Sequence, residues 1–380
     1  MLQKTSAEIR PGRGVVVNGA FLSTRSPGLG RMASELVLGL DALLADPGRI
    51  AGLGRFELAC LPGARPLELA NIVRRPAGGL DPEIWEQTAL PWLARGRLLI
   101  NLCNTAPLAH RGGLLAIHDA HVFMMPESHS PSYAAWRRFA LPRAAARATR
   151  LFTVSEFSRR TLAEHGVAPE ARFAVIPNGA DHLLRTPSSP EVIRRLGLQD
   201  RPFVLAVANA QKHKNVGVLL KAFSGRLAAP FTLVLVGRDG ARAFAAAGHA
   251  PPAPPRVIFA GRLPDGELRA LYEAAVCLAA PSLLEGFGLM TAEAMSLGCP
   301  VVASPRAALP EVCGEAAAYA DPEDPDAWIG EIRRLAGDAG ARAAAVAAGL
   351  RRAAGMPWSG SARALLGLIA EAAAEEAVQA

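Results

Sequence analysis

The stretch VCLAAPS (276–282), LLEGFGLM (283–290), TAEAMSLG (291–298) and CPVVAS (299–304) predicts a strand, a glycine-containing loop, a helix and a second strand. Both apolar runs are continuous rather than alternating, which is typical of strands buried on both faces of a parallel sheet. In such a unit the loop lies at the carboxyl end of the first strand, where open α/β sheets bind ligands. The stretch therefore predicts an α/β fold and a candidate site in its loop.

The same alternation of apolar runs and helical patterns extends to both sides of this stretch. The predicted strands are 14–22, 97–102, 113–119, 150–155, 202–209, 231–237 and 256–261, and the predicted helices are 31–46, 215–225, 265–275 and 361–380. Two sets of strands and helices indicate two doubly wound Rossmann-like domains that face a central cleft. We expect domains at 1–180 and 181–360, a linker at 182–200, and the C-terminal helix 361–380 completing the first domain.

Composition excludes several classes of protein. The 380 residues are 51% hydrophobic and 20% charged, which excludes a disordered or fibrous chain. No apolar run reaches the roughly 18–20 residues that a membrane-spanning helix needs, and residues 1–14 lack the apolar core of a secretory signal. The five cysteines form no C-x-x-C pair, so we expect buried thiols rather than disulfides or a zinc site. These features predict a cytoplasmic protein.

The basic residues are unevenly distributed. Residues 1–178 hold 21 Lys and Arg against 14 Asp and Glu, which accounts for the whole net charge of +7. Only four basic residues are lysines, and Lys212, Lys214 and Lys221 lie within ten residues of one another. Because Lys212 and Lys214 follow the strand 202–209, we interpret the loop 209–215 as a contact for a diphosphate, which a compact ammonium group suits. The alternative is an exposed polar loop.

Two glutamates flank the glycines of the first stretch. Gly286 and Gly288 allow a ligand to approach the backbone, and the free N–H groups at the start of the following helix favour an anion. Glu285 would project from the loop, and Glu293 would lie about two turns into the helix. Carboxylates so placed can accept hydrogen bonds from two groups of hydroxyls on one elongated ligand. In the alternative, Glu285 only caps the helix and Glu293 faces solvent.

The other motifs are a glycine run, a histidine at a strand end and an acidic pair. The run from Gly28 to Ala33 matches G-x-G-x-x-A. The loop 23–28 before it, and the lack of an acidic residue at the end of a second strand about 20 residues on, disfavour a dinucleotide fingerprint. A glycine loop facing a phosphate across the cleft fits better. His118 ends the strand 113–119, so its imidazole is expected to point into the cleft toward a substrate, or else to be structural. Asp324-Pro-Asp326 is typical of a helix cap. We therefore predict no metal.

The chain resembles the retaining GT-B glycosyltransferases of family GT4. The segments that carry the resemblance are TVSEFSRRTL (153–162), VIPNGAD (175–181), KNVGVLLKAF (214–223), VIFAGRLPDGELRALYEAA (257–275), APSLLEGFGLMTAEAMSLGCPVVAS (280–304) and ALPEVCGEAA (308–317). Before residue 150 the resemblance is looser and depends on SPGLGR and AIHD. The most similar pattern is that of bacterial mannosyl- or rhamnosyl-type transferases of O-antigen and exopolysaccharide synthesis.

The resemblance implies a role for each matching residue. Glu293 would hold the ribose of a nucleotide-sugar, Glu285 and the backbone of residues 286–288 would face the sugar, and Lys214 would neutralise the diphosphate in place of a metal. His118 would contact the sugar and stabilise the transition state, and an arginine common in relatives is here Asn209, for which Lys212 can substitute. The full donor site that we predict comprises Gly28, Gly30, Asn209, Lys212, Lys214, Gly261, Arg262, Glu285, Gly286, Phe287, Gly288, Leu289 and Glu293, with His118, Glu285 and Lys214 as catalytic residues.

The implied activity is metal-independent transfer of a hexose, with retention and without a cofactor, from a nucleotide-sugar to a saccharide or lipid-linked saccharide. GDP-mannose is the expected donor; UDP-glucose, dTDP-rhamnose, another GT-B activity and a non-catalytic sugar-nucleotide-binding relative are the alternatives.

Seven arginines between Arg137 and Arg160, with Trp136 and Phe139, favour an anionic membrane surface or else a solvated face, so the protein is expected to be peripheral on the inner face of the cytoplasmic membrane. The lack of a nucleic-acid module disfavours nucleic acid.

Overall fold

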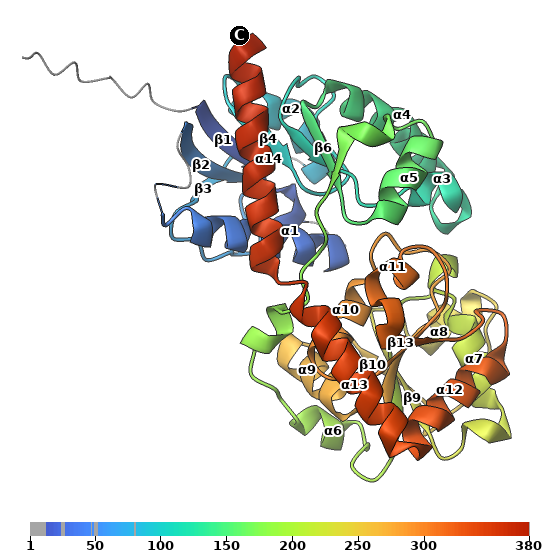
Figure 1. Ribbon diagram of the computed structural model, residues 1–380. Helices are drawn as coiled ribbons and strands as arrows, with labels where there is room; N and C mark the ends of the chain where they lie inside the picture. Colours follow the sequence, from blue (N-terminus) through green and yellow to red (C-terminus); the bar gives the residue numbers. More distant parts are fainter. Residues whose placement is uncertain (1–12, 24–26, 47, 49–51, 80, 380) are drawn as a thin grey trace, which may run out of the picture.

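The computed structural model describes residues 13–379 except 24–26, 47, 49–51 and 80, and it contains two parallel sheets, one above the other in Figure 1. The first has the strand order β3-β2-β1-β4-β5-β6-β7. Its strands are β1 (Arg13–Asn18), β2 (Leu53–Cys60), β3 (Val73–Pro76), β4 (Leu98–Asn101), β5 (Leu114–Ala116), β6 (Arg150–Thr153) and β7 (Phe173–Val175). All of its neighbouring strands pair in parallel.

The second sheet has the order β10-β9-β8-β11-β12-β13 and is also parallel throughout. Its strands are β8 (Phe203–Val207), β9 (Thr232–Val236), β10 (Val257–Gly261), β11 (Cys277–Ala280), β12 (Val301–Ala303) and β13 (Ala317–Tyr319). In each sheet the order reverses at one point, between β1 and β4 and between β8 and β11. The predicted α/β class with two doubly wound sheets is therefore confirmed.

Helices connect the strands and cover both sheets (Figure 1). They are α1 (Pro27–Leu43), α2 (Pro82–Leu93), α3 (His121–Met124), α4 (Pro131–Arg147), α5 (Glu156–Glu164), α6 (Glu191–Arg195), α7 (Val216–Ser224), α8 (Ala241–Ala246), α9 (Asp265–Ala274), α10 (Leu289–Ser296), α11 (Leu309–Cys313), α12 (Pro325–Gly337), α13 (Ala339–Ala354) and α14 (Trp358–Gln379). After α13 in the second domain the chain returns to the first, where α14 packs against α1. A Cβ added to Gly39 of α1 would lie 2.5 Å from the Cβ of Ala362, so glycine permits this close contact.

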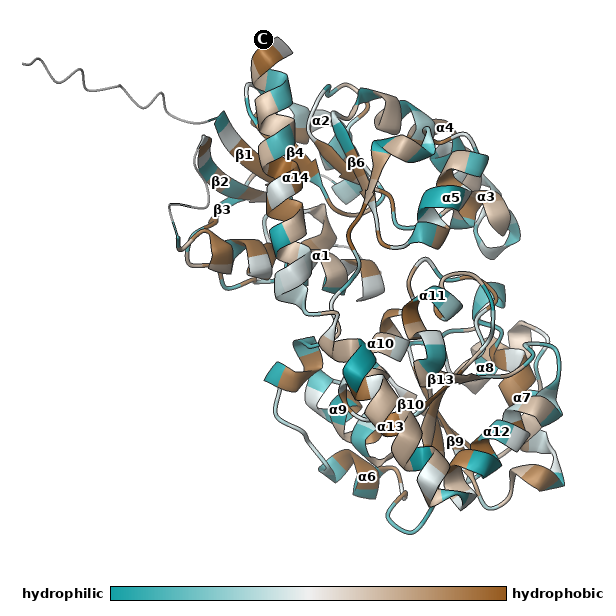
Figure 2. Ribbon diagram, viewed as in Figure 1, coloured by the Kyte–Doolittle hydropathy of each residue, from teal (hydrophilic) through white to brown (hydrophobic). Residues whose placement is uncertain are grey.

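The cores follow from the continuous apolar runs. Val15 and Val17 of β1 and Leu98 and Ile100 of β4 are fully buried, together with Ile369 of α14. Figure 2 shows the hydrophobic colour on the strands of both domains and the hydrophilic colour on outward helix faces. Burying apolar surface on both faces of each sheet is the main stabilising term of such a fold. The cysteines within the described chain are free thiols, and all but the partly buried Cys103 are buried, as expected.

Two boundaries differ from the sequence prediction. Strand β1 ends at Asn18, and residues 20–23 form a short 3-10 helix. Helix α1 begins at Pro27, four residues earlier than expected, because proline is well tolerated in a first helical turn. Gly28 and Gly30 therefore lie in the first turn of α1 rather than in a preceding glycine loop. The loop 23–28 and residues 1–14 lie partly outside the described residues.

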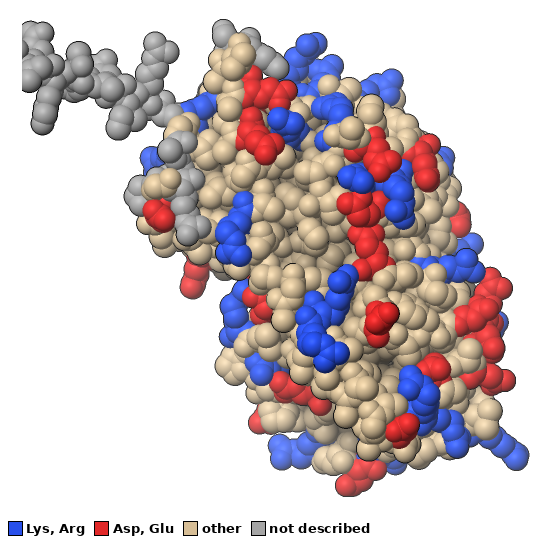
Figure 3. Space-filling view, viewed as in Figure 1, with Lys and Arg blue, Asp and Glu red and all other residues tan. Residues whose placement is uncertain are grey.

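The segment 182–200 is not a free linker. Leu183, Val192 and Leu198 are buried in the core of the second domain, beside Ala270 and Leu271. Their apolar side chains draw the segment onto α9, so the chain crosses between the domains at 176–181, immediately after β7. None of the described helices is long and apolar enough to cross a membrane. On the face in Figure 3, basic and acidic side chains are interspersed over both domains.

Candidate functional site

The predicted donor loops lie at the point where the strand order of the second sheet reverses. The loop with Lys212 and Lys214 follows β8, and the loop with Glu285 and Gly286 follows β11, the strand hydrogen-bonded to β8. Loops that follow neighbouring strands on opposite sides of a reversal diverge and leave a crevice at the carboxyl edge of the sheet. The topology thus brings together two loops that are about 70 residues apart in the sequence.

Lys214 and Glu285 form the centre of this site. The Nζ atom of Lys214 donates a hydrogen bond of 2.6 Å to Oε1 of Glu285, and the two side chains are only 16% and 13% exposed. Charge-assisted hydrogen bonds of this length are among the strongest in proteins. Asn215, in the left-handed conformation, turns the chain from this loop into α7 and donates hydrogen bonds to Pro281 and Pro322 carbonyls, which fixes the lysine loop against β11.

The loop after Glu285 leads directly into α10. Gly288 has φ +87°, a conformation that favours glycine, and a Cβ there would also lie 2.5 Å from Leu309. Phe287 is buried, and Leu289 begins the helix. The first-turn amides of α10 therefore emerge beside Glu285, as the sequence predicts.

Glu293 is buried in the middle of α10. It is the fifth residue of the helix, so it lies about one turn from the start rather than the predicted two turns. Its side chain accepts a hydrogen bond of 2.9 Å from the hydroxyl of Tyr272 and lies 3.0 Å from Nε2 of His182. Burial, followed by the charge of Glu293, raises the pKa of Tyr272 well above its usual range, so Tyr272 remains a donor. The alternative of a solvent-facing Glu293 is wrong.

The other predicted donor residues surround this centre less closely. Asn209 exchanges hydrogen bonds with Gln211 in its own loop, and Lys212 is exposed. Gly261, with φ +71°, is the last residue of β10, and Arg262 follows it at the same edge of the sheet. Arg262 is exposed without an ion pair among the described residues. Among the described side chains of the predicted site, Lys214 and Glu285 are the pair that a hydrogen bond joins across two loops.

The N-terminal glycines lie across the cleft at the start of α1. A Cβ on Gly28 would meet no atom within 4 Å, and one on Gly30 would meet only the carbonyl oxygen of Phe21 at 3.6 Å. Internal packing therefore does not require glycine at either position, which leaves room for a ligand to approach. In the same turn, Arg31 forms an ion pair with Asp265 of the second domain. The first turn of α1 therefore faces the second domain.

The sequence predicts that the imidazole of His118 points into the cleft, but the residue is buried, with 5% of its surface exposed. Its Nε2 atom lies 2.7 Å from the carbonyl oxygen of Leu102. Since a carbonyl only accepts, Nε2 carries the proton and Nδ1 of the neutral ring keeps its lone pair. Burial lowers the pKa of His118, so the ring is neutral near pH 7. A strand-end position fixes where the residue lies but not where its ring points.

Contacts between the two domains involve residues that the sequence analysis did not single out. The hydroxyl groups of Ser155 and Ser158 donate to the carbonyl oxygen of Gly286, at 2.6 and 3.2 Å. Glu311 of α11 accepts hydrogen bonds from the backbone N–H groups of Glu156 and Phe157, at 2.7 and 2.8 Å. These are the free amides of the first turn of α5, which favour a carboxylate. The motif 153–162 thus connects the domains at the donor loop.

A second contact between the domains is made by histidine rings. His213 stands between the two lysines, and its ring centroid is 4.1 Å from that of His121, which is 4.7 Å from that of His129. Burial, and then the charge of Lys214, lowers the pKa of His213 to about 2, and burial also lowers the pKa of His121 and of His129. Uncharged imidazoles can approach one another closely, so the two domains are in contact here without charge repulsion.

The arginines between Arg137 and Arg160 do not form one free cationic cluster. Arg137 is buried and donates to the Asn104 carbonyl, and Arg150 and Arg159 form ion pairs with acidic residues. Arg137 is removed from the surface because it lies on the inward face of α4, and the charges of Arg150 and Arg159 are paired by nearby carboxylates. The outward face of α4 instead exposes Tyr133, Trp136 and Phe139 at 42%, 46% and 47%. The guanidinium of Arg143 lies 3.6 Å from the centroid of the Phe139 ring.

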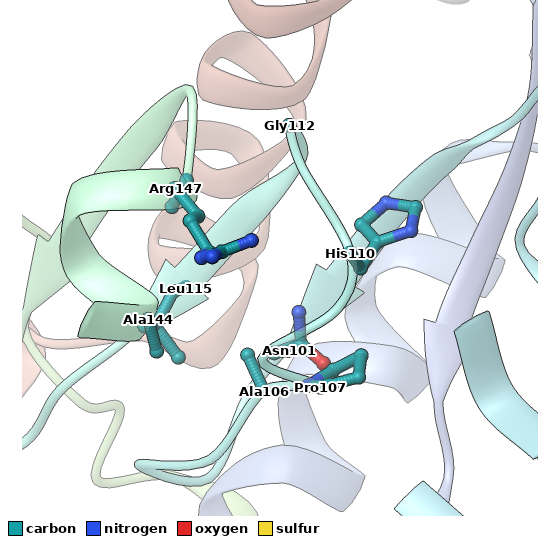
Figure 4. A pocket seen from close by; sticks show the side chains of 9 residues that line it. Asn101, Ala106, Pro107, His110, Gly112, Leu115, Ala144 and Arg147 are labelled. Carbon is teal, nitrogen blue, oxygen red and sulfur yellow. The ribbon is translucent and has the colours of Figure 1, made fainter. Parts of the chain in front are cut away.

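Two remaining features lie outside this site. Asp324 caps α12 by accepting hydrogen bonds from the N–H groups of Asp326 and Ala327, as predicted. A small pocket in the first domain, shown in Figure 4, is lined by His110 and Arg147 and by Asn101, Ala106, Pro107, Gly112, Leu115, Ala144 and Ala148. None of the predicted donor or catalytic residues lines it. Within the described ranges, no group of three or more His, Cys, Asp or Glu is arranged to hold a metal ion.

Solved structures similar to this one have the same two-domain architecture. The sucrose-phosphate synthase of Thermosynechococcus elongatus superimposes with a TM-score of 0.70 at 19% identity, covering 95% of this chain and 99% of that one. Anabaena HepE, solved in complex with UDP-glucose, superimposes with a TM-score of 0.67 at 20% identity, covering 97% of this chain and 99% of that one. These likenesses support the GT-B fold.

Sequence relatives and family profiles add the activity class. O-antigen chain mannosyltransferase B of Escherichia coli is 31% identical over 66% of this chain and 68% of its own length. A D-inositol 3-phosphate glycosyltransferase of Salinispora tropica is 30% identical over 90% of this chain and 74% of its own length. The profile "Glycosyltransferase Family 4" matches residues 73–182, and "Glycosyl transferases group 1" matches residues 201–338, which include the loops of Lys214 and Glu285. The chain therefore belongs to the group 1, or family 4, glycosyltransferases and is itself a glycosyltransferase.

Proposed function

We propose that this glycosyltransferase transfers mannose from GDP-mannose to a saccharide or lipid-linked saccharide, with retention of configuration and without a metal ion. The observation that carries the donor site is the Lys214–Glu285 pair, which the reversal between β8 and β11 places beside the first-turn amides of α10. Lys214 would stabilise negative charge on the departing diphosphate, the task that a divalent cation performs elsewhere. The choice of mannose is supported by the likeness to O-antigen chain mannosyltransferase B.

The remaining residues take complementary roles in this proposal. Glu293 would accept hydrogen bonds from the ribose hydroxyls, and Glu285 and the amides of residues 286–288 would face the hexose. Lys214 would then exchange part of its interaction with Glu285 for the diphosphate. Nδ1 of His118, the lone-pair nitrogen of a neutral ring, would accept a hydrogen bond from a sugar hydroxyl. Each role uses a group that carries a donor or acceptor of the required kind.

The reaction would proceed by attack on the same face as the leaving group. The bond between the anomeric carbon and the phosphate oxygen breaks, the acceptor oxygen bonds to that carbon, and the departing phosphate takes the acceptor's proton. This route needs no protein nucleophile, and the charge that develops lies on the diphosphate, where Lys214 would stabilise it. The departing nucleotide would therefore supply the base and Lys214 the cation.

A second acceptor class is favoured by a specific likeness. The D-inositol 3-phosphate glycosyltransferase of Salinispora tropica aligns with a larger share of this chain than the mannosyltransferase does, at nearly the same identity. Inositol phosphate is therefore the second acceptor to test.

A donor panel in the presence of excess EDTA tests the proposed reaction. We expect the purified protein to release GDP from GDP-mannose when a saccharide acceptor is added, at a rate that EDTA does not change. GDP-fucose, UDP-glucose and dTDP-rhamnose serve as competing donors. Turnover only with UDP-sugars would contradict the choice of mannose, and full loss of turnover in EDTA, restored by Mg²⁺ or Mn²⁺, would contradict metal independence.

We further propose that the outward face of α4 contacts an anionic membrane, on which a lipid-linked acceptor would be presented. The support is the exposed row of Tyr133, Trp136 and Phe139 with the cation of Arg143 beside it. Aromatic rings of this kind are favoured at the boundary between lipid and water, and a nearby arginine adds attraction to anionic headgroups.

Replacing the two stacked rings of α4 should weaken vesicle binding. We expect Trp136→Ala with Phe139→Ala to lower affinity for phosphatidylglycerol vesicles by roughly tenfold or more, because partial burial of each ring contributes about 1 kcal/mol. Trp92→Ala is the matched control, since Trp92 is an even more exposed tryptophan, at 72%, on α2. Equal vesicle binding by both variants and the wild type in co-sedimentation would contradict the membrane proposal.

A further inference from the structure

The two segments that join the domains are bound to each other. The first crosses at 176–181, immediately before His182, and the second at 355–357, between α13 and the first turn of α14. Ala180 donates its N–H to the carbonyl of Met356 at 2.8 Å, and Ser361 Oγ donates to the carbonyl of Pro177 at 2.6 Å. A Cβ on Gly179 would lie 2.6 Å from the Cα of Trp358, so only glycine permits this contact. The two crossings form one structural unit.

This unit also connects to Glu293 through buried side chains. The indole N–H of Trp358 donates to Nδ1 of His182 at 3.1 Å, and Nε2 of the same ring lies 3.0 Å from Oε1 of Glu293. The other carboxylate oxygen of Glu293, Oε2, accepts a hydrogen bond from the hydroxyl of Tyr272. Trp358, His182 and Tyr272 are 2%, 3% and 0% exposed, so water does not compete for these groups. A continuous polar chain thus runs from the inter-domain crossing to the middle of α10.

The direction of each donor in this chain is fixed by chemistry. An indole N–H can only donate, so Nδ1 of His182 must offer its lone pair, and the ring proton is therefore on Nε2, facing the carboxylate. The Nε2 atom lies close to the carboxylate, but its N–H bond does not meet hydrogen-bond geometry, so the contact is a close approach rather than a hydrogen bond. Glu293 consequently has a donor beside each of its two oxygens before any ligand arrives, which restricts its rotation.

We propose that Trp358 and His182, together with Tyr272, are positioning residues that orient Glu293 toward the ribose of the nucleotide. By donating to Nδ1, Trp358 fixes the ring proton of His182 on Nε2. His182 and Tyr272 then hold the two oxygens of the Glu293 carboxylate so that the remaining lone pairs of these oxygens face the cleft. Because Trp358 begins α14 at the second crossing and His182 follows directly after the first, the orientation of this carboxylate depends on how the domains are joined. This inference rests on the proposed function, in which Glu293 is the ribose ligand.

The test measures preference for ribose rather than affinity alone. Calorimetry with GDP and with 2′,3′-dideoxy-GDP gives the ratio of the two dissociation constants, and UDP with its dideoxy form replaces them if the wild type binds UDP instead. We expect the wild type to prefer the ribonucleotide on the order of 30-fold, since hydrogen bonds to a charged acceptor are strong. His182→Ala should lower this preference about tenfold and Trp358→Phe about threefold, with dideoxynucleotide affinity unchanged in both.

Matched variants separate positioning from general loss of packing. Trp328 is a fully buried tryptophan whose indole donates to the Asp321 carbonyl at 2.8 Å, remote from Glu293, so Trp328→Phe should leave the ribose preference unchanged. His182→Gln places an amide N–H near the position of Nε2 and should restore part of the preference. In turnover assays, His182→Ala should raise the KM for the donor while kcat changes little.

Three outcomes are distinguishable with Glu293→Gln as a further variant. If Glu293→Gln and the His182 and Trp358 variants all lose the ribose preference, the proposal is supported. If only Glu293→Gln loses it, Glu293 binds ribose without help from the crossing, and the positioning inference is overturned. If Glu293→Gln keeps the preference, the ribose site itself is elsewhere, and the proposed role of Glu293 fails with it.

Discussion

Replacing Lys214 by alanine should lower kcat by roughly 100- to 1,000-fold, the loss seen when one preorganised donor to a developing negative charge is removed. The Nζ atom of Lys214 lies 2.6 Å from Oε1 of Glu285, and the lysine side chain is largely shielded from water. In such surroundings a positive charge interacts with a diphosphate more strongly than in solvent. Steady-state turnover of the preferred nucleotide-sugar measures the effect.

Removing this lysine also leaves the shielded Glu285 carboxylate without its cation, which is costly by itself. The double variant Lys214→Ala with Glu285→Gln, compared with Glu285→Gln alone, separates the two causes. Turnover of the double variant should lie well below that of Glu285→Gln if the missing charge is responsible, and should match it if the unpaired carboxylate is. Lys221→Ala, on the exposed side of α7, is the matched control and should keep full turnover. Wild-type turnover in Lys214→Ala would contradict the catalytic role.

The fold and the centre of the site were predictable from sequence for one physical reason. Strands buried on both faces read as continuous apolar runs, and parallel strands bring the residues that follow them to the same edge of the sheet. Lys214 and Glu285 follow two such runs, so their proximity could be expected. β2, with Arg55 and Glu57 among its apolar residues, was not predicted because it lacks a continuous apolar run, and β7 and β13 were not predicted because each is only three residues long.

The remaining parts of the site depend on contacts that no local pattern encodes. Glu311 caps α5 from a position 155 residues away, and Trp358 reaches His182 across 176 residues. Both contacts exist only because the two domains are placed face to face, which each domain's own periodicity does not specify. The direction of the His118 ring also could not be predicted, because a strand-end position does not determine the side-chain rotamer. In the structure, the hydrogen bond to the Leu102 carbonyl orients the ring.

Gly286 lies at a close contact between the two domains. Its carbonyl oxygen accepts from Ser155 and Ser158 of the first domain. A Cβ added to Gly286 would overlap the carbonyl oxygen of His118 and lie 3.1 Å from Cβ of Asp119. The overlapped atom belongs to the backbone of β5's trailing loop, so a change of rotamer cannot relieve it, and one domain must move away from the other.

Gly286→Ala should therefore disfavour the closed arrangement of the domains. Overpacking of this kind costs about 1–3 kcal/mol, so we expect kcat to fall roughly ten- to hundredfold. Binding of the free nucleoside diphosphate should change little, because Lys214 and Glu293 belong to the second domain alone. Each domain also keeps its own core, so the unfolding temperature should stay close to that of the wild type. Small-angle scattering should report a larger radius of gyration.

The control for this substitution is a glycine with free space around it. A Cβ on Gly330 of α12 would meet no atom within 4 Å, and alanine is the better helix former there. Gly330→Ala should therefore keep full turnover and gain slightly in stability. If Gly286→Ala turns over as fast as Gly330→Ala and is equally compact, close contact at Gly286 is not needed for transfer. If Gly286→Ala instead loses nucleotide affinity in proportion to kcat, the substitution acts within the donor loop rather than between the domains.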